Sequence, residues 1–185
     1  NSIGGTDFYT GIPVLKGEII SLIFTPGSGY SSIEPPTIKI IHHDGNGFTL
    51  SEPTISNGVV TSLEITNGGS DYLSSYLPSF VITHRGGSGF EIKDVVIRGT
   101  VHSIPILGEG SGYSSSSLPI ININDNSGSG LTFGIIATNN GIITDIEIVS
   151  GGVNYISNNL PTFDIYNNGT VEHIITDAMN YGNVR

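Results

Sequence analysis

Two short segments offer the side chains that metal ions prefer. The run His42-His43-Asp44 supplies imidazole and carboxylate groups, which suit zinc or iron. The run Asn124-Asp125-Asn126-Ser127-Gly128 is rich in the oxygen atoms that Ca²⁺ binds, but it lacks the later bidentate glutamate of an EF-hand. Adjacent strand residues point to opposite faces, so only a trimer axis would gather several copies of one histidine. We therefore expect solvated histidines, an ordinary turn, no metal and no cofactor.

Acid–base chemistry has one candidate pair. Glu64 and Glu147 occupy the same position of a sequence repeat, and a glycosidase needs two positioned carboxylates. Equivalent positions do not make them neighbours, so we interpret them as outward strand residues, and a polysaccharide depolymerase is the enzymatic alternative. The Gly-x-Gly elements recur between strands and not before a helix, which argues against dinucleotide binding. We interpret His84, His102 and His173 as surface residues without a shared repeat position, and we expect no enzymatic activity.

Four tyrosines recur at nearly equal intervals and form the remaining candidate site. Tyr30, Tyr72, Tyr113 and Tyr155 are separated by 42, 41 and 42 residues. If exposed on one face, they would form aromatic platforms for sugar rings or for a partner protein. Because each follows the same glycine-rich turn, we favour packing over that turn, with the hydroxyl bound to a loop carbonyl.

Glycines and prolines recur in step with the tyrosines. The prolines repeat the same three spacings, at Pro36, Pro78, Pro119 and Pro161. Such a period signals an array of supersecondary units that cannot bury their apolar faces alone. Each period opens with a glycine and a strand whose third, sixth and eighth positions are apolar, beginning at Gly17, Gly58, Gly99 and Gly141. The step from the third to the sixth position breaks strand alternation, which predicts a bulge near Ser21, Ser62, Ser103 and Asp145.

A second and a third strand complete each period. Proline opens the second strand, in which two apolar side chains share one face: Ile38/Ile40, Phe80/Ile82, Ile121/Ile123 and Phe163/Ile165. A second glycine turn then leads to a third strand, predicted around residues 49–55, 91–97, 132–137 and 172–176. Asn57-Gly58 and Asn140-Gly141 are strong signals for hairpin turns.

The predicted fold class is all-β. Four tandem three-stranded antiparallel repeats of ~41 residues would pack into one elongated or pseudo-symmetric array, because an isolated meander is only marginally stable. The expected organisation is a leading segment (1–16), repeat 1 (17–57), repeat 2 (58–98), repeat 3 (99–140), and repeat 4 with a C-terminal cap (141–185).

The composition limits the classes of partner that the chain can bind. The formal net charge is −10, and only 12% of residues are charged, so we expect neutral hydrogen-bonding groups to make up most of the polar surface. A phosphate backbone needs clustered cations, which argues against nucleic acid. No apolar run approaches the ~20 residues that cross a bilayer, so membrane insertion is not expected. The chain has no cysteine and begins with Asn, and we expect a processed product or a fragment.

The signature resembles a known structural repeat. The pattern G-x-[VI]-x-S-[LI]-x-[VI], then G-x-G-Y, then P-x-[VI]-x-[VI], is cleanest over residues 58–97 and covers about residues 17–176. It resembles a glycine-rich β-repeat of tailed-phage virion proteins, also present in some bacterial surface proteins. The resemblance implies a tail, fibre, baseplate or capsid component and carries over no catalytic residue. Asp71 and Asn154 depart from it by replacing the last glycine of the turn, and both residue types tolerate a left-handed backbone.

The expected function is therefore that of a non-enzymatic rigid scaffold in a virion. Its expected partners are other virion proteins and further copies of itself, with a trimer suggested by viral analogy. The alternative is an adhesin that binds host glycans through the tyrosines and loops such as residues 114–117, located on a virion or a bacterial cell surface.

Overall fold

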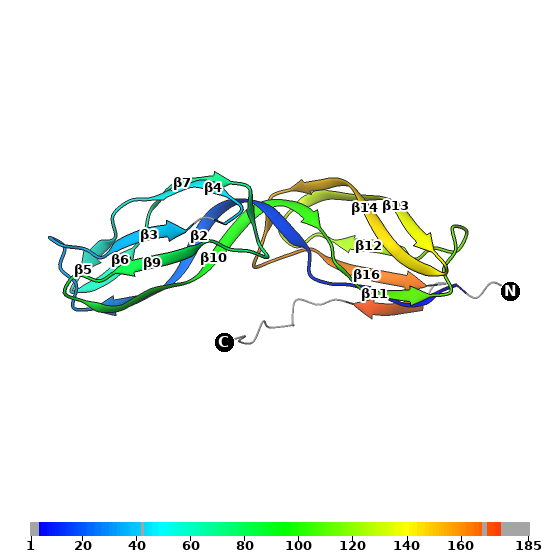
Figure 1. Cartoon of the computed structure of the whole chain (residues 1–185), viewed down its shortest axis with the longest axis horizontal. Coiled ribbons are helices and arrows are strands. Elements are labelled where there is room, and N and C mark those ends of the chain that lie inside the picture. The colour runs from blue at the N-terminus through cyan, green and yellow to red at the C-terminus, as the bar shows by residue number, and fades with distance from the viewer. Residues whose placement is uncertain (1–3, 42, 168–169, 175–185) are drawn as a thin grey trace. The chain divides into compact units, whose positions relative to one another are not determined.

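The computed structural model describes residues 4–41, 43–167 and 170–174, and these residues form an all-β protein (Figure 1). Helix is absent from them and strands account for 69%, which confirms the predicted fold class. The strands are β1 Thr6–Thr10, β2 Val14–Ser28, β3 Thr37–Ile41, β4 Asn46–Leu50, β5 Thr54–Ser56, β6 Val59–Ser62, β7 Ile65–Ser70, β8 Tyr72–Leu73, β9 Ser79–Thr83, β10 Ser88–Ser103, β11 Ile106–Ser111, β12 Ile120–Asn124, β13 Ser129–Asn139, β14 Ile142–Val153, β15 Tyr155–Ile156, β16 Thr162–Asn167 and β17 Thr170–Ile174.

The chain forms two compact units. Unit 2 is Leu15–Gly99, and unit 1 combines Asn1–Val14 with Thr100–Arg185. The chain passes between the units within two long strands, β2 and β10. Unit 2 thus contains the first two predicted repeats, and unit 1 contains the last two together with most of the leading segment.

In unit 2, strands pair between repeats. The antiparallel pairs β3–β9, β4–β7 and β5–β6 each join a strand of residues 17–57 to one of residues 58–98, and β2 lies between β10 and β8. A meander inside each repeat is therefore not confirmed. The cause is local, because the tightest turn lies at the boundary between two repeats and folds the end of one onto the start of the next.

That boundary turn has the predicted hairpin geometry. Asn57 and Gly58 have φ angles of 50° and 78°, and Asn140 and Gly141 have 50° and 87°, as a type I′ turn requires. At the equivalent positions, Lys16-Gly17 and Arg98-Gly99, the backbone stays extended and the strand runs on. Lysine and arginine lack asparagine's tolerance for the left-handed region. The Cα of Gly99 would lie 2.6 Å from a Cβ added at Gly17, so the two long strands need glycine where they meet.

Unit 1 repeats this arrangement with a strand from the leading segment. β12 pairs with β16, β13 with β14, and β11 with β1, while β17 adds to β16. Residues 5–8 (Gly-Thr-Asp-Phe) follow the pattern of the second glycine turn, with Asp7 at a φ of 62° in place of the second glycine. β1 thus provides the strand that β10 provides in unit 2.

Each unit encloses its own apolar core. One cluster of buried residues in unit 2 contains Tyr30, Val60 and Phe90, and one in unit 1 contains Phe8, Tyr113, Ile143, Ile146 and Ile165. The third position of the first strand is buried in every repeat: Ile19, Val60, Val101 and Ile143. On the second strands, the predicted apolar pairs face inward and alternate with more exposed neighbours.

Two of the predicted bulges lie within one residue of their expected places. Thr61 is the extra residue between the paired positions Thr54–Ser62 and Ile55–Val60. Thr144 is the extra residue between Ala137–Asp145 and Thr138–Ile143. The bulge turns the strand so that apolar residues on either side of it reach the same core.

No helix in the described ranges could span a bilayer.

Candidate functional site

The four recurring tyrosines lie inside the units. Their exposed fractions are 5% for Tyr30, 1% for Tyr72, 4% for Tyr113 and 0% for Tyr155. Each ring lies against a glycine from a different repeat or from the leading segment, in the pairs Tyr30–Gly87, Tyr72–Gly45, Tyr113–Gly5 and Tyr155–Gly128. A Cβ added at any of these glycines would overlap the ring. We call each tyrosine–glycine pair a tyrosine clamp.

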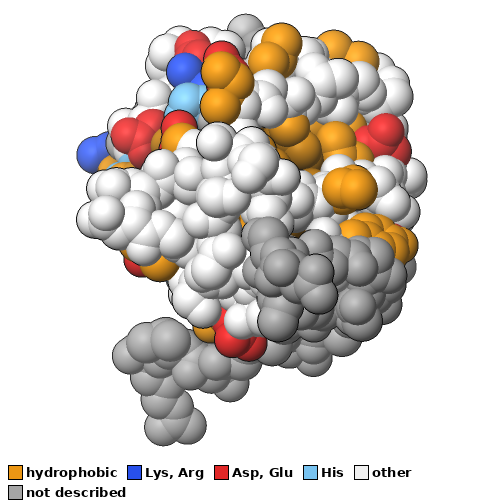
Figure 2. Space-filling model, turned by 90° about the vertical axis from the view of Figure 1, so that its right-hand side faces the viewer, with side chains coloured by type: hydrophobic (Ala, Val, Ile, Leu, Met, Phe, Trp, Pro, Cys, Tyr) orange, Lys and Arg blue, Asp and Glu red, His pale blue; other side chains and the backbone are white. Residues whose placement is uncertain are grey.

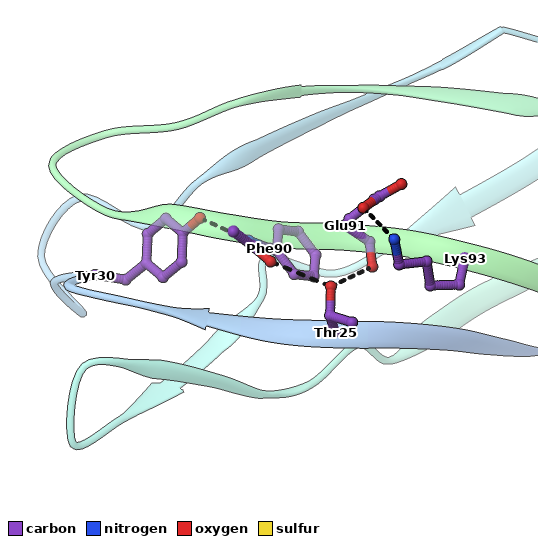
Figure 3. Close-up of polar contacts among 6 residues, drawn as sticks. Thr25, Tyr30, Phe90, Glu91 and Lys93 are labelled. Carbon is purple, nitrogen blue, oxygen red and sulfur yellow. Dashed lines mark hydrogen bonds and ion pairs between the residues drawn. The ribbon is translucent and has the colours of Figure 1, made fainter.

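Backbone hydrogen bonds fix the clamps. The amide N–H of Phe48 donates to the hydroxyl of Tyr72 at 3.3 Å, and that of Leu131 donates to Tyr155 at 3.3 Å. Phe90 donates to Tyr30 at 3.2 Å, and the two rings meet edge to face with centroids 6.4 Å apart (Figure 3). The hydroxyl of each of these buried tyrosines thus has a hydrogen-bond partner, as burial of a tyrosine requires.

The hydroxyls of Tyr30, Tyr113 and Tyr155 each bond to a polar side chain of another repeat. That side chain belongs to the sixth residue after the proline that opens the second strand of its repeat. Tyr30 Oη lies 2.6 Å from His84 Nδ1, Tyr113 donates to Asn167 Oδ1 at 2.8 Å, and Tyr155 donates to Asp125 Oδ1. His84 is exposed, as expected, and its hydrogen bond to a clamp tyrosine was not predicted. Its position relative to Pro78 could have revealed it, since polar residues stand at that offset in all four repeats. The first of them, His42, lies outside the described residues.

Two of the clamp tyrosines, Tyr72 and Tyr155, have raised pKa values. Burial raises the pKa of Tyr155 to about 12, and its hydrogen bond to Asp125 acts in the same direction. Burial also raises the pKa of Tyr72, against the opposing effect of the Phe48 N–H. Both phenols keep their protons at neutral pH, so they act as hydrogen-bonding anchors and not as bases.

The turns before Tyr72 and Tyr155 have the expected left-handed backbone. Asp71 and Asn154 have φ angles of 64° and 61°, which confirms that these residue types replace glycine without breaking the turn. Hydrogen bonds from Lys16 and Ser70 lower the pKa of Asp71, and the Lys16 Nζ–Asp71 Oδ1 distance is 3.1 Å. Both groups are well exposed, so this ion pair adds little stability.

The two metal candidates have other contacts. The ring of His43 stacks on Tyr76 with centroids 4.3 Å apart. Within residues 4–41, 43–167 and 170–174, no group of three histidine, aspartate or glutamate side chains could hold a metal ion. In the other segment, Asn126 Nδ2 donates to Leu160 O at 2.7 Å and Asn124 Nδ2 to Asp164 Oδ2 at 3.0 Å. These bonds brace a turn.

The candidate carboxylates belong to different units. Glu147 Oε2 accepts the N–H of Ile135 at 2.9 Å, where the register of β13 shifts. Glu64 is exposed, as is His102, and the side chain of His173 lies outside the described residues. Glu147 therefore holds an irregular strand in place, which is a structural contact.

Two surface features could meet a ligand. Residues 114–117 form a tight exposed loop, in which Ser117 N donates to Ser114 O at 2.9 Å. A shallow groove of about 340 Å³ in unit 2 is lined mainly by apolar residues: Pro35, Pro36, Thr37, Ile38, Ile40, Phe48, Thr49, Leu50, Ser51, Glu52 and Pro53. The sequence did not predict this groove, since its walls come from separate strands.

No protein-family model, no curated protein and no solved structure matches this chain.

Proposed function

We propose that this chain is a non-enzymatic structural module, a rigid β-repeat scaffold in a phage tail, fibre, baseplate or capsid decoration. Its four tandem repeats of ~41 residues would pack as two interlocked pairs. The module would hold its exposed loops at fixed spacing. Partners would be other virion proteins and further copies of the chain, with a trimer suggested by the resemblance.

The observation that supports this proposal is the repeated tyrosine clamp. Each clamp uses a ring and a glycine to join segments far apart in the sequence, and backbone N–H groups bond to the hydroxyls of Tyr30, Tyr72 and Tyr155. Side chains that could be reactive, such as Asp125 and Glu147, serve the same purpose by bracing turns and strands. Residues are thus used for rigidity where an enzyme would use them for chemistry.

The surface is in keeping with a packed assembly. On the face drawn in Figure 2, charged side chains are sparse and hydrophobic ones lie among uncharged polar atoms. Exposed apolar residues include Leu107, Ile120, Ile135 and Val149, at 64%, 65%, 73% and 67% exposure. Contacts with neighbouring virion proteins would cover such residues.

Immunogold labelling of intact particles tests the proposal. Antibodies raised against the purified chain should label one recurrent position on particles that carry the parent gene. Antibodies pre-adsorbed with the chain are the control and should leave the particles bare. Label confined to the soluble fraction, with clean particles bare, would refute the virion assignment.

The alternative of a glycan-binding adhesin is supported by one aromatic pair. The buried clamp tyrosines present no ring face to a sugar, but Tyr76 is 54% exposed and stacked on His43. A sugar ring can stack on such a surface. Glycan-array binding that Tyr76→Ala abolishes and Tyr9→Ala preserves would support this alternative. An array without signal from the folded protein would remove it.

A further inference from the structure

The second strands of the repeats form one antiparallel pair in each unit, and these two pairs differ at one edge. In unit 1, β16 pairs with β12 on one side and with β17 on the other. In unit 2, the equivalent strand β9 pairs with β3 in the same way, and no further described strand pairs with it. The chain itself therefore shows that this kind of edge accepts an added antiparallel strand.

Burial differs at the same place. Phe163 and Ile165 on β16 have exposed fractions of 1% and 0%. The equivalent inward residues of β9, Phe80 and Ile82, remain partly exposed, although Ile82 packs on the unit 2 core. The side of unit 2 next to β9 is thus less completely covered than its counterpart in unit 1.

The edge of β9 also lacks the features that keep strands from pairing between molecules. The strand Ser79–Thr83 contains no charge and no proline, and its pairing with β3 has no register shift. Its central outward residue, Val81, is 48% exposed and lies opposite Lys39 of β3. Protected edges normally carry a charge, a proline or a bulge.

We propose that the free edge of β9 binds β9 of a second copy of this chain in an antiparallel two-fold pair. Such a pair places Ser79 opposite Thr83 and Val81 opposite its own counterpart. The chain has a net charge of −10, yet this contact brings no like charges together, because the edge is neutral and self-complementary. The contact goes beyond the scaffold proposal, since it does not depend on membership of a particle.

Sedimentation velocity of the full chain over a wide concentration range tests this contact. We expect a monomer–dimer equilibrium that Val81→Glu weakens by about tenfold or more, because two carboxylates would lie opposite each other. Within each copy the new glutamate faces Lys39, so the melting temperature should not fall. Ile120→Glu, on the outward face of β12, is the matched control and should leave the dimer unchanged.

Charge complementation identifies the register. An equimolar mixture of the Val81→Glu and Val81→Lys variants should recover the dimer that Val81→Glu loses. Since the chain has no cysteine, Val81→Cys introduces a unique thiol, which should form a disulfide-linked dimer on mild oxidation while Ile120→Cys does not. A monomer at every concentration, or a dimer that is insensitive to Val81→Glu and lost with Ile120→Glu, would overturn the proposal.

Discussion

At the scale of single residues, the molecule depends on packing a tyrosine ring against a glycine, which has no side chain. Tyr155 lies on Gly128, accepts the N–H of Leu131 and donates to Asp125. The ring provides buried apolar area and the hydroxyl satisfies a buried amide, so one residue type does both. The same contacts explain why the chain repeats tyrosine and glycine and not simply apolar and polar residues.

Tyr155→Phe should lower the free energy of unfolding by about 1–3 kcal/mol, because it leaves the buried Leu131 N–H without its acceptor. Urea denaturation measures the change. Tyr76→Phe is the control, since Tyr76 is half exposed, and it should alter stability by less than about 0.5 kcal/mol. Equal losses in the two variants would contradict the role of the clamp hydroxyl.

Tyr155 should also give stability a dependence on alkaline pH. Its folded pKa of about 12 lies above the ordinary tyrosine pKa of 10.0, so the folded state holds the phenol proton more tightly than the unfolded state. The contribution is complete below pH 10 and is lost as the pH rises through 12. Unfolding curves should show a steeper alkaline loss for the natural chain than for Tyr155→Phe. Parallel losses would show that the folded pKa is not raised.

At the scale of elements, two-residue turns decide which strands pair. Asn57-Gly58 and Asn140-Gly141 adopt a left-handed backbone and close hairpins, whereas Lys16-Gly17 and Arg98-Gly99 stay extended. The sequence predicted the all-β class, the inward pairs and both hairpins, because these follow from local periodicity. Pairing between repeats was not predictable, since a period shows that units are alike and not which strands they share. The role of Thr6–Thr10 was missed because a single strand has no period of its own.

Asn140→Ala should destabilise the chain by about 1 kcal/mol, because alanine tolerates the left-handed region poorly. Asn139→Ala, one residue earlier at the end of β13, is the control and should change stability little. Thermal unfolding followed by circular dichroism compares the two. If the two variants melt together, the turn does not determine the hairpin.

Ile82→Asp should unfold unit 2, because it places a charge without a partner against the apolar cluster of Tyr30, Val60 and Phe90, on which the partly buried Ile82 packs. Val81→Asp, on the opposite face of the same strand, should fold normally, and so should a substitution at the exposed residue Asn46, at the start of β4. Circular dichroism and proteolysis distinguish the cases. A folded Ile82→Asp variant would show that the assigned faces of β9 are wrong.

At the scale of the whole molecule, strand exchange between repeats makes the repeats interdependent. A repeat of 41 or 42 residues contains no complete sheet in unit 2, because its ladders are shared with the neighbouring repeat. We therefore expect the smallest cooperative element to be a pair of repeats, and we expect this design to be stiffer than a chain of separate meanders. A scaffold whose function is to hold spacing under load would benefit from this.

Single-molecule stretching between the two chain ends tests this cooperativity most directly. Unit 2 spans Leu15–Gly99, and its fully extended length is roughly 300 Å at about 3.6 Å per residue. We predict that unit 2 unfolds in one step that releases nearly this length, separate from the loss of unit 1. Four equal steps of roughly 150 Å each, which independent repeats of ~41 residues would give, would contradict the account.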